Sequence, residues 1–388
     1  MIGAVLAGVA IGGGIVAAVD RDTPTAAATR VGEDPWRTTV PFHGAHQAGI
    51  ATPTQASATL LAFDLRPDVD RAAIGRLLRL WTADAATLAS GSPIIGDSAP
   101  GLAADPAGLT ITVALGFGAF AQVDAVDRWP LAIREIPPYR IDDLQERWSD
   151  GDLLLQIAGD DPVSVYHAAH ELTRDAVPFA TVRWQQRGFN GPADIAQGEI
   201  GRNLLGQVDG IANPAPDSPA FAEQTWATTP AAMRGGTTMV VRRIRFDLET
   251  WDLLSETKKE RVVGRDVEEG APLSGGTQTT PMDFAATEPD GDPLVPKSAH
   301  AQRAATKPGE GITRRGYNYD DGYTARGERD AGLVFVSFQR TIEQYLAIQA
   351  ALAEIDTLNL WATPIGSALF IVPPGAEPGD WIGEALLG

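Results

Sequence analysis

Cysteine is absent from the 388 residues of the chain, and its absence excludes several kinds of site. Without a thiol the chain forms no disulfide, offers no thiolate to a metal or an iron–sulfur cluster, and makes no covalent c-type haem attachment. Histidine is also scarce, with five in the whole chain. An imidazole ligand for a metal or cofactor therefore has to come from a short set: His43, His46, His167, His170 and His300.

Positive charge is the second shortage. Lys and Arg total 31 against 50 Asp and Glu, which gives a net charge of −19 at pH 7. A surface of this charge repels nucleic-acid phosphates and anionic lipid headgroups. We therefore exclude nucleic acid as a partner and expect an acidic soluble protein, long enough for two domains of ordinary size.

The first 37 residues differ in composition from the rest. Residues 1–19 are apolar and uncharged, and a stretch of charged residues, threonines, alanines and one proline follows to residue 30. This pattern indicates the apolar region of an export signal or, as the alternative, an uncleaved anchor helix. We assign residues 1–37 to an export signal and linker, although the positively charged start of such signals is missing.

The hydrophobic periodicity divides the remainder into two similar halves. Residues 38–200 follow the order β-α-β-β-α-β, which is that of a ferredoxin-like unit, and residues 201–388 repeat it around a loop-rich segment at 271–322. The sequence therefore predicts an α+β fold of two ferredoxin-like domains, each an antiparallel sheet with helices. We expect strands at 57–63, 109–115, 152–157, 179–184, 238–246, 333–338 and 368–372, and helices at 69–88, 162–172, 257–263 and 341–353.

One loop of the second half has the composition of a site. Within residues 202–214, a carboxylate lies between glycines, in the order Gly206, Asp209 and Gly210. Glycine accepts the positive φ of a tight turn, so Asp209 can project into open space. Taken alone, the pattern is typical of a surface turn that the following Asn-Pro pair closes.

The chain resembles the dye-decolourising (DyP-type) haem peroxidases. Gly206-Gln207-Val208-Asp209-Gly210 matches their Gly-x-x-Asp-Gly signature, and the similarity covers nearly all of the chain after residue 38. It is greatest to the exported branch, which includes the peroxidase/deferrochelatase subunit of bacterial iron-uptake systems. Other similar segments are Val40–Ile50, Gly151–Ile157, Gly235–Thr237, Glu249–Asp252, Pro364–Ser367 and Pro373–Gly375.

The resemblance implies a cofactor and a reaction. The cofactor is haem b (iron protoporphyrin IX), bound non-covalently and mainly by the second domain. The reaction consumes hydrogen peroxide and oxidises organic donors such as dyes or phenols. Gly206 and Gly210 would let their loop approach the haem.

On the proximal side of the haem, His300 matches the iron ligand of the family. Asp356 lies where relatives place an acidic partner for that histidine, and a surface Asp at a helix end is the alternative. Relatives usually carry His-x-Arg here, whereas this chain has Arg303 one position later. Arg303 is our candidate for a haem propionate, and its offset leaves that pairing open.

On the distal side, Asp209 matches the acid–base that takes a proton from peroxide and returns it. Arg314 matches the arginine that stabilises charge as the O–O bond splits, with Arg315 as the alternative. Leu333 and Phe335 share one strand face and match the apolar lining of the distal pocket. Carboxylates stay ionised in mild acid, where imidazole is protonated, so we expect a peroxidase optimum at about pH 4 to 5.

Several alternatives remain open. A deferrochelatase that releases iron from haem, with an iron-uptake permease as partner, and a non-catalytic haem carrier both fit the same residues. The pairs His43/His46 and His167/His170, spaced i, i+3, have either structural roles or a metal-binding role that lacks a third ligand. Both a monomer and a homo-oligomer are compatible with the sequence.

Exported relatives carry a twin-arginine leader, and that route moves folded proteins that already hold their cofactor. We therefore expect this protein to be exported by the twin-arginine route to the periplasm, the cell surface or the exterior. The arginine pair would be encoded upstream of Met1.

Overall fold

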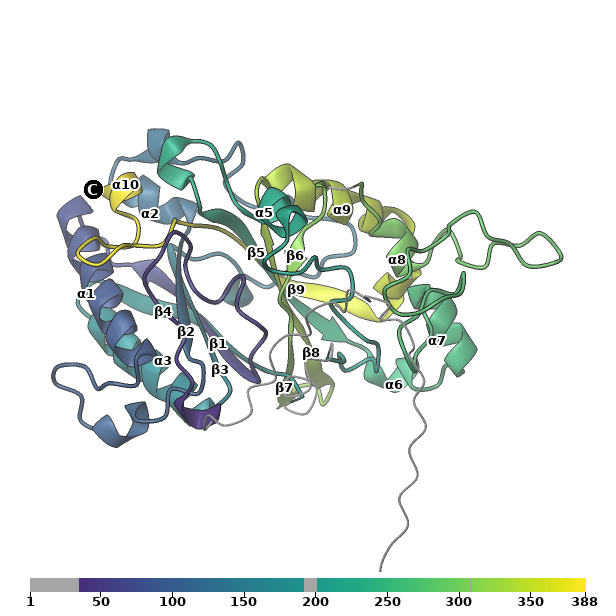
Figure 1. Ribbon diagram of the computed structural model, residues 1–388, viewed down its shortest axis with the longest axis horizontal. Helices are drawn as coiled ribbons and strands as arrows, with labels where there is room; N and C mark the ends of the chain where they lie inside the picture. The colour runs from purple at the N-terminus through teal and green to yellow at the C-terminus, as the bar shows by residue number, and fades with distance from the viewer. Residues whose placement is uncertain (1–34, 192–200, 308) are drawn as a thin grey trace, which may run out of the picture. The chain divides into compact units, whose positions relative to one another are not determined.

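The structure, a computed structural model, describes residues 35–191, 201–307 and 309–388 (Figure 1). The expected export signal lies outside the described residues, except for a 3-10 helix at Pro35–Arg37. None of the described helices is long and apolar enough to cross a membrane.

Four antiparallel strands of the first half lie side by side in the order β2-β3-β1-β4. All residues of β2 and β3 are buried, including the polar Thr110, Thr112 and Gln156. The strands are β1 (Ser57–Leu65), β2 (Thr110–Leu115), β3 (Leu153–Gly159) and β4 (Ala180–Phe189).

Two helices, α1 (Arg71–Ala89) and α3 (Pro162–Ala176), lie beside these strands (Figure 1). Each begins at an aspartate that caps free N–H groups: Asp70 accepts from Ala73, and Asp161 from Val163 and Ser164. The apolar face of α1, including the fully buried Trp81, packs into the core of this half. The remaining elements here are α2 (Phe117–Gln122) and 3-10 helices at Pro100–Ala103, Val126–Arg128 and Glu146–Trp148.

The second half contributes strands in the order β9-β5-β8-β7, with β6 also paired to β8. They are β5 (Thr237–Phe246), β6 (Thr313–Arg314), β7 (Tyr317–Tyr323), β8 (Arg329–Gln339) and β9 (Ala362–Val372). Helices α6 to α9 gather on the opposite side of the strands from α1 and α3 (Figure 1). The helices are α5 (Pro219–Thr225), α6 (Leu248–Trp251), α7 (Glu256–Val263), α8 (His300–Arg303), α9 (Ile342–Ile355) and α10 (Glu384–Leu387), with 3-10 helices at Ala231–Met233 and Thr357–Leu360.

Single residue pairs connect the two groups of strands. Leu115 of β2 pairs with Ile371 of β9, and Phe189 of β4 pairs with Asn318 of β7. Because β5 also pairs with β8, the strand neighbours form a closed ring to which β6 is attached. Side chains of both halves fill a shared core inside this arrangement, and the described residues from Pro35 to Gly388 pack as one unit.

Arg243 of β5 lies where the two halves meet. Its buried guanidinium lies over the rings of Trp148 and Tyr319, at 4.3 and 4.1 Å from their centroids. It also pairs with Asp321 at 2.8 Å and Asp330 at 3.0 Å. A buried cation is stable here because carboxylates and aromatic faces surround it.

The α+β class and the antiparallel pairing expected from the sequence are confirmed. The loop-rich assignment of 271–322 is wrong at its end, where β6 and most of β7 lie. Tyr317 and Tyr319 alternate inward and are fully buried. The Asp-Asp-Gly sequence that follows is unfavourable in strands, so the sequence pattern did not predict β7.

Candidate active site

The loop that carries Asp209 turns tightly. Gly206 has φ +80° and Gly210 φ +111°, values that residues with a side chain rarely adopt. A Cβ at Gly206 would meet nothing within 4 Å, so conformation and not space requires glycine there. Asn203 closes the turn, since its N–H donates to the Gln207 carbonyl at 3.0 Å and its Oδ1 accepts from the Leu205 N–H at 3.0 Å.

Asp209 and Arg314 form an ion pair at the end of this loop. The Arg314 Nη1 lies 3.1 Å from the Asp209 Oδ1. The other carboxylate oxygen accepts from the Asn203 amide at 3.2 Å. The two side chains are 26% and 27% exposed, so the carboxylate is held in direction and remains accessible to a small molecule.

Arg265 adds positive charge to this region. Burial, and then the nearby charge of Arg314, lower the pKa of the Arg265 guanidinium. The side chain is fixed by bonds from its Nη1 to the carbonyls of Gly270 at 2.7 Å and Gln278 at 3.2 Å. Arg314 therefore has a second cation near it as well as its carboxylate partner. No sequence pattern pointed to Arg265.

Arg315 points away from Asp209. Its side chain is buried and donates to the carbonyl of Pro53 at 2.9 Å and to Thr52 and Gln55, all in the first half. Successive residues of an extended chain point to opposite faces, as expected for this pair. Arg314 is therefore the arginine beside Asp209, and Arg315 ties the two halves together.

Asn213 holds the backbone of Arg314 on both sides. Its Nδ2 donates to the Arg314 carbonyl at 2.6 Å, and its Oδ1 accepts from the Arg314 N–H at 2.9 Å. The sequence suggested only that Asn213 and Pro214 close a turn. The presence of Asn213 beside the Asp209 loop indicated a hydrogen-bonding residue. Its partner Arg314 lies 101 residues later, so no local pattern identifies that partner.

His300 begins α8, and its Nδ1 lies 2.7 Å from the Asp356 Oδ2. Asp356 is buried, so the surface alternative for this aspartate is wrong. It ends α9 and also caps the next 3-10 helix by accepting from the Leu358 N–H at 2.9 Å. The hydrogen bond to Nδ1 leaves Nε2 of the 30% exposed imidazole without a partner among the described residues. Nε2 is therefore free to bind a metal.

Apolar side chains and unpartnered polar atoms lie near these groups. Leu333 and Phe335 are half-buried on β8, and Leu333 packs in one cluster with Leu205 and Leu358. Ser337 shares their strand face, and its buried Oγ has no hydrogen-bond partner in the described chain. Leu205 is next to the Asp209 loop and Leu358 next to Asp356. This cluster therefore connects the two sets of polar residues.

Two family models match the chain: the Dyp-type peroxidase N-terminal model over residues 47–190 and the C-terminal model over residues 201–377. The dye-decolorizing peroxidase of Thermobifida fusca (strain YX) is 39% identical over 362 residues, which are 88% of this chain and 84% of that protein. The chain belongs to the DyP-type peroxidase family. It is a peroxidase, an oxidoreductase of a family of haem proteins, as the sequence predicts.

Another relative of this DyP-type peroxidase has a different activity. The deferrochelatase of Escherichia coli (strain K12) is 33% identical over 371 residues, 89% of this chain and 87% of that protein. Among solved structures, the DyP-type peroxidase of Cellulomonas bogoriensis has a TM-score of 0.87 at 41% identity and covers 92% of this chain and 99% of its own. Ferric DtpA of Streptomyces lividans has a TM-score of 0.86 at 38% identity, covering 90% and 97%.

Arg303 of the peroxidase is engaged with α9. Its Nε donates to the Ala351 carbonyl at 3.1 Å, and its Nη2 pairs with Glu354. The structure thus gives Arg303 a partner within the protein and does not bring it together with Asp209.

The remaining histidines of the peroxidase make separate contacts. His43 lies 3.1 Å from the Ala376 carbonyl, and His46 lies 2.7 Å from the Gly235 carbonyl and stacks on Trp226. His170 is exposed and stacks on Tyr166, whereas its neighbour His167 is buried. Neither i, i+3 pair brings both of its imidazoles to one point.

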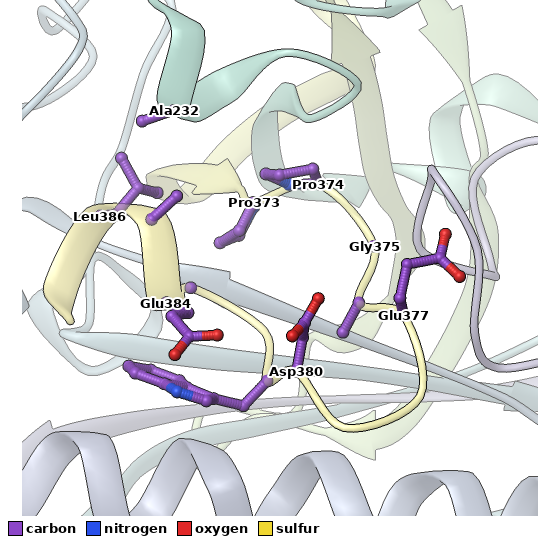
Figure 2. Close-up of a pocket in the computed structure, with 12 residues that line it drawn as sticks. Ala232, Pro373, Pro374, Gly375, Glu377, Asp380, Glu384 and Leu386 are labelled. Atoms are coloured by element: carbon purple, nitrogen blue, oxygen red, sulfur yellow. The ribbon is translucent and has the colours of Figure 1, made fainter.

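A hollow of about 280 Å³ lies beside the chain from Pro373 to Leu386 (Figure 2). Carboxylates of Glu377, Asp380 and Glu384 line it together with Trp381. None of the predicted site residues borders this hollow.

Proposed function

We propose that this peroxidase binds haem b non-covalently through the Nε2 of His300. The observation that supports the proposal is the 2.7 Å contact between His300 Nδ1 and the buried Asp356. A carboxylate at Nδ1 fixes the tautomer, orients the ring and makes Nε2 a stronger ligand. The unpartnered Ser337 Oγ and the half-buried Leu333 and Phe335 fit a planar group with an apolar body.

Asp209 and Arg314 would act on hydrogen peroxide in this proposal. Haem, when bound, supplies the iron at which the O–O bond is cleaved. Asp209 accepts a proton from the inner oxygen of hydrogen peroxide and returns it to the outer oxygen, so that water leaves. Arg314 orients the carboxylate and stabilises negative charge during cleavage, because its own charge is fixed. Organic donors such as dyes or phenols would supply the two electrons that the reduction of peroxide needs, one electron at a time.

The test is the absorption spectrum of haem-loaded wild type and of His300→Ala, before and after one equivalent of hydrogen peroxide. We expect the Soret band of wild type to shift on adding peroxide, and the variant to lose haem or to show an altered Soret band. An unchanged spectrum in His300→Ala would refute the ligand assignment.

Iron release from haem is the second function we propose, because a deferrochelatase is 33% identical over most of its length. Its partner would be an iron-uptake permease. Incubation with haem and analysis of the products separates the two: free porphyrin supports the deferrochelatase, and donor oxidation with intact haem supports the peroxidase. The variant Asp209→Ala separates both enzymes from a haem carrier. An enzyme should keep its haem and lose turnover in this variant, whereas a carrier should keep its haem and has no turnover to lose.

We propose that residues 38–200 and 201–388 each form a ferredoxin-like domain. The strand orders β4-β1-β3-β2 and β9-β5-β8-β7 support this. When the two-residue β6 is left out of the count, each order places the first and third strands of its half at the centre. The family models also meet between residues 190 and 201. Cleavage between residues 191 and 201, followed by size-exclusion chromatography in mild denaturant, tests whether two folded pieces exist.

We propose that the protein is exported by the twin-arginine route and acts outside the cytoplasm, supported by the apolar segment at 1–19. A reporter fused to the leader should leave the cytoplasm of cells that have the twin-arginine translocase and should remain in the cytoplasm of cells that lack it. Light scattering of the purified protein distinguishes a monomer from a homo-oligomer.

A further inference from the structure

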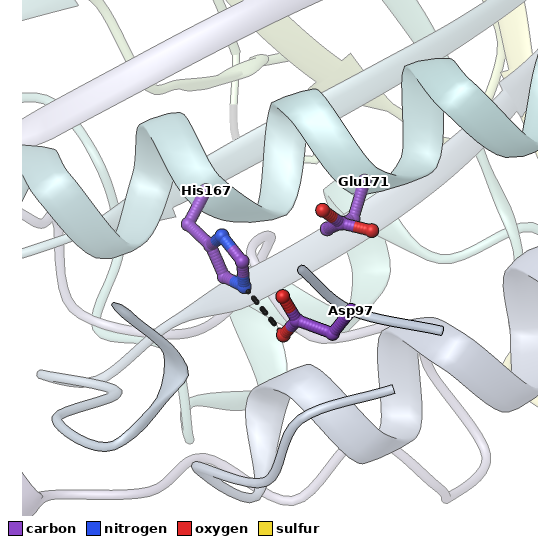
Figure 3. Close-up of side chains that lie close together, drawn as sticks. All are labelled: Asp97, His167 and Glu171. Atoms are coloured by element: carbon purple, nitrogen blue, oxygen red, sulfur yellow. Dashed lines mark hydrogen bonds and ion pairs between the residues drawn. The ribbon is translucent and has the colours of Figure 1, made fainter. Parts of the chain in front are cut away.

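Three side chains that the peroxidase reaction does not use converge between α3 and the segment joining α1 to β2. His167 and Glu171 lie one turn apart on α3, and both point toward Asp97 of that segment (Figure 3). One donor atom from each lies within 4.8 Å of the other two. His167 Nε2 and Asp97 Oδ2 are already 3.0 Å apart.

These side chains are removed from water. Their exposed fractions are 3% for His167, 1% for Asp97 and 1% for Glu171. Asp97 has no Lys or Arg partner in the described part of the chain. Glu171 has one, Arg174 at 2.8 Å, which is itself 41% exposed. Two buried carboxylates with so little compensation are costly unless another cation joins them.

We propose that Asp97, His167 and Glu171 bind one divalent transition-metal ion of the Zn²⁺ type. One imidazole nitrogen and two carboxylate oxygens form a mixed set that such ions accept, whereas Mg²⁺ and Ca²⁺ prefer oxygen alone. With a neutral imidazole the ligands carry two negative charges, which the ion cancels.

The distance between His167 and Asp97 suits this ion with little movement. Two ligands at about 2.0 to 2.1 Å from a tetrahedral ion are about 3.3 Å apart. The His167–Asp97 distance of 3.0 Å therefore has to widen by only a few tenths of an ångström. Glu171 has to turn from Arg174 toward the other two ligands. A fourth position remains for water.

Arg174 controls access in this arrangement. Its guanidinium contacts Glu171 and also donates to the Gly96 carbonyl at 3.1 Å, next to Asp97. Because the side chain is partly exposed, it can move into solvent while the ion takes its place. The bound ion then fastens the segment around Asp97 to α3, and we expect it to stabilise the fold without taking part in peroxide turnover.

The experiment uses the full haem-loaded protein, dialysed against a chelator and then titrated with Zn²⁺ by calorimetry. We expect one Zn²⁺ per chain that depends on this cluster, and a rise in Tm of about 3 to 5 °C at a hundredfold excess over Kd. Asp97→Asn and Glu171→Gln keep the shape of the ligands and should each weaken Zn²⁺ binding at least tenfold. His170→Ala, on an exposed neighbouring position, is the matched control and should leave binding unchanged.

Far-ultraviolet circular dichroism and the Soret band show whether each variant folds and retains haem. Wild type with no saturable Zn²⁺ site would overturn the proposal whatever the variants do. Zn²⁺ binding that survives in both folded carboxamide variants, or that is lost in His170→Ala, would overturn it as well.

Discussion

The side chain of Asn213 binds both backbone groups of Arg314. Its Oδ1 accepts from the Arg314 N–H at 2.9 Å, and its Nδ2 donates to the Arg314 carbonyl at 2.6 Å. The arginine side chain then reaches Asp209 at 3.1 Å. The loop that carries the carboxylate and the strand that carries the guanidinium are thus fixed to each other by an amide that touches neither charged group.

Replacing Asn213 by Ala should therefore lower activity through Arg314. We expect kcat/KM for hydrogen peroxide to fall about 10- to 100-fold, mostly in kcat, with about 1 to 2 kcal/mol lost from the free energy of unfolding. Asn190→Ala is the control, because Asn190 donates to the nearby Gly316 carbonyl at 3.3 Å. Equal losses of activity in the two variants would contradict a specific role for Asn213.

The neighbours Arg314 and Arg315 should respond oppositely to the same change. Lysine at 314 cannot reproduce the guanidinium beside Asp209, so peroxide turnover should fall about 100-fold with little change in Tm. Lysine at 315 leaves buried acceptors of the first half unsatisfied and should cost about 2 to 4 kcal/mol of stability. Steady-state kinetics and chemical denaturation separate the two, and a reversed pattern would show that Arg315 is the functional arginine.

Asp356→Asn tests the partner of His300. Asparagine keeps the cap on the following 3-10 helix but removes the negative charge 2.7 Å from Nδ1. The imidazole then donates less electron density to the iron that it would bind. We therefore expect the reduction potential of bound haem to rise and peroxidase activity to fall about 10- to 100-fold. Potentiometric titration measures the first effect. An unchanged potential would mean that Asp356 serves only the fold.

Asp175 makes stability depend on pH. Burial, followed by the charge of Asp84 and a hydrogen bond with it, raises the pKa of Asp175 to about 7. An unfolded Asp titrates near ~3.9, so the folded protein binds the extra proton between these values. This contribution to stability is complete below about pH 4 and is lost as pH rises through 7.

Asp175→Asn should remove that dependence. At pH 8 we expect the variant to be more stable than wild type by on the order of 1 kcal/mol, after allowing for solvent screening, and at pH 5 the difference should shrink. Denaturation in the presence of a chelator measures both values. The exposed Asp68→Asn controls for the loss of one negative charge, and a parallel response in the two variants would refute the assignment.

The sequence predicted the parts of this molecule that depend on local patterns. Amphipathic periodicity located the helix now seen at Arg71–Ala89 within two residues at its start, and the two glycines located the Asp209 turn. The contact of His300 with Asp356 was anticipated only through the family resemblance. Side chains 56 residues apart meet there because α8 packs beside α9.

Features that depend on tertiary contact were not predictable. Arg265 and Asn213 act on residues about 50 and 100 positions away, and the Asp97 cluster combines a helix with a loop. The His167/His170 spacing left metal binding open beside a structural role, but the helix turns His170 outward and brings Glu171 beside His167 instead. On a helix, residues four positions apart lie on the same face whatever their type.

Because the strand neighbours form a closed ring, the first half of the chain supports the strands of the second half. Arg315 is anchored in Thr52, Pro53 and Gln55, and side chains of both halves interlock in one core. A substitution that opens a cavity in the first half, for example at Leu60, should therefore weaken haem binding although it changes none of the proposed haem ligands. Loss of the Soret band would then serve as a gauge of folding for the whole chain.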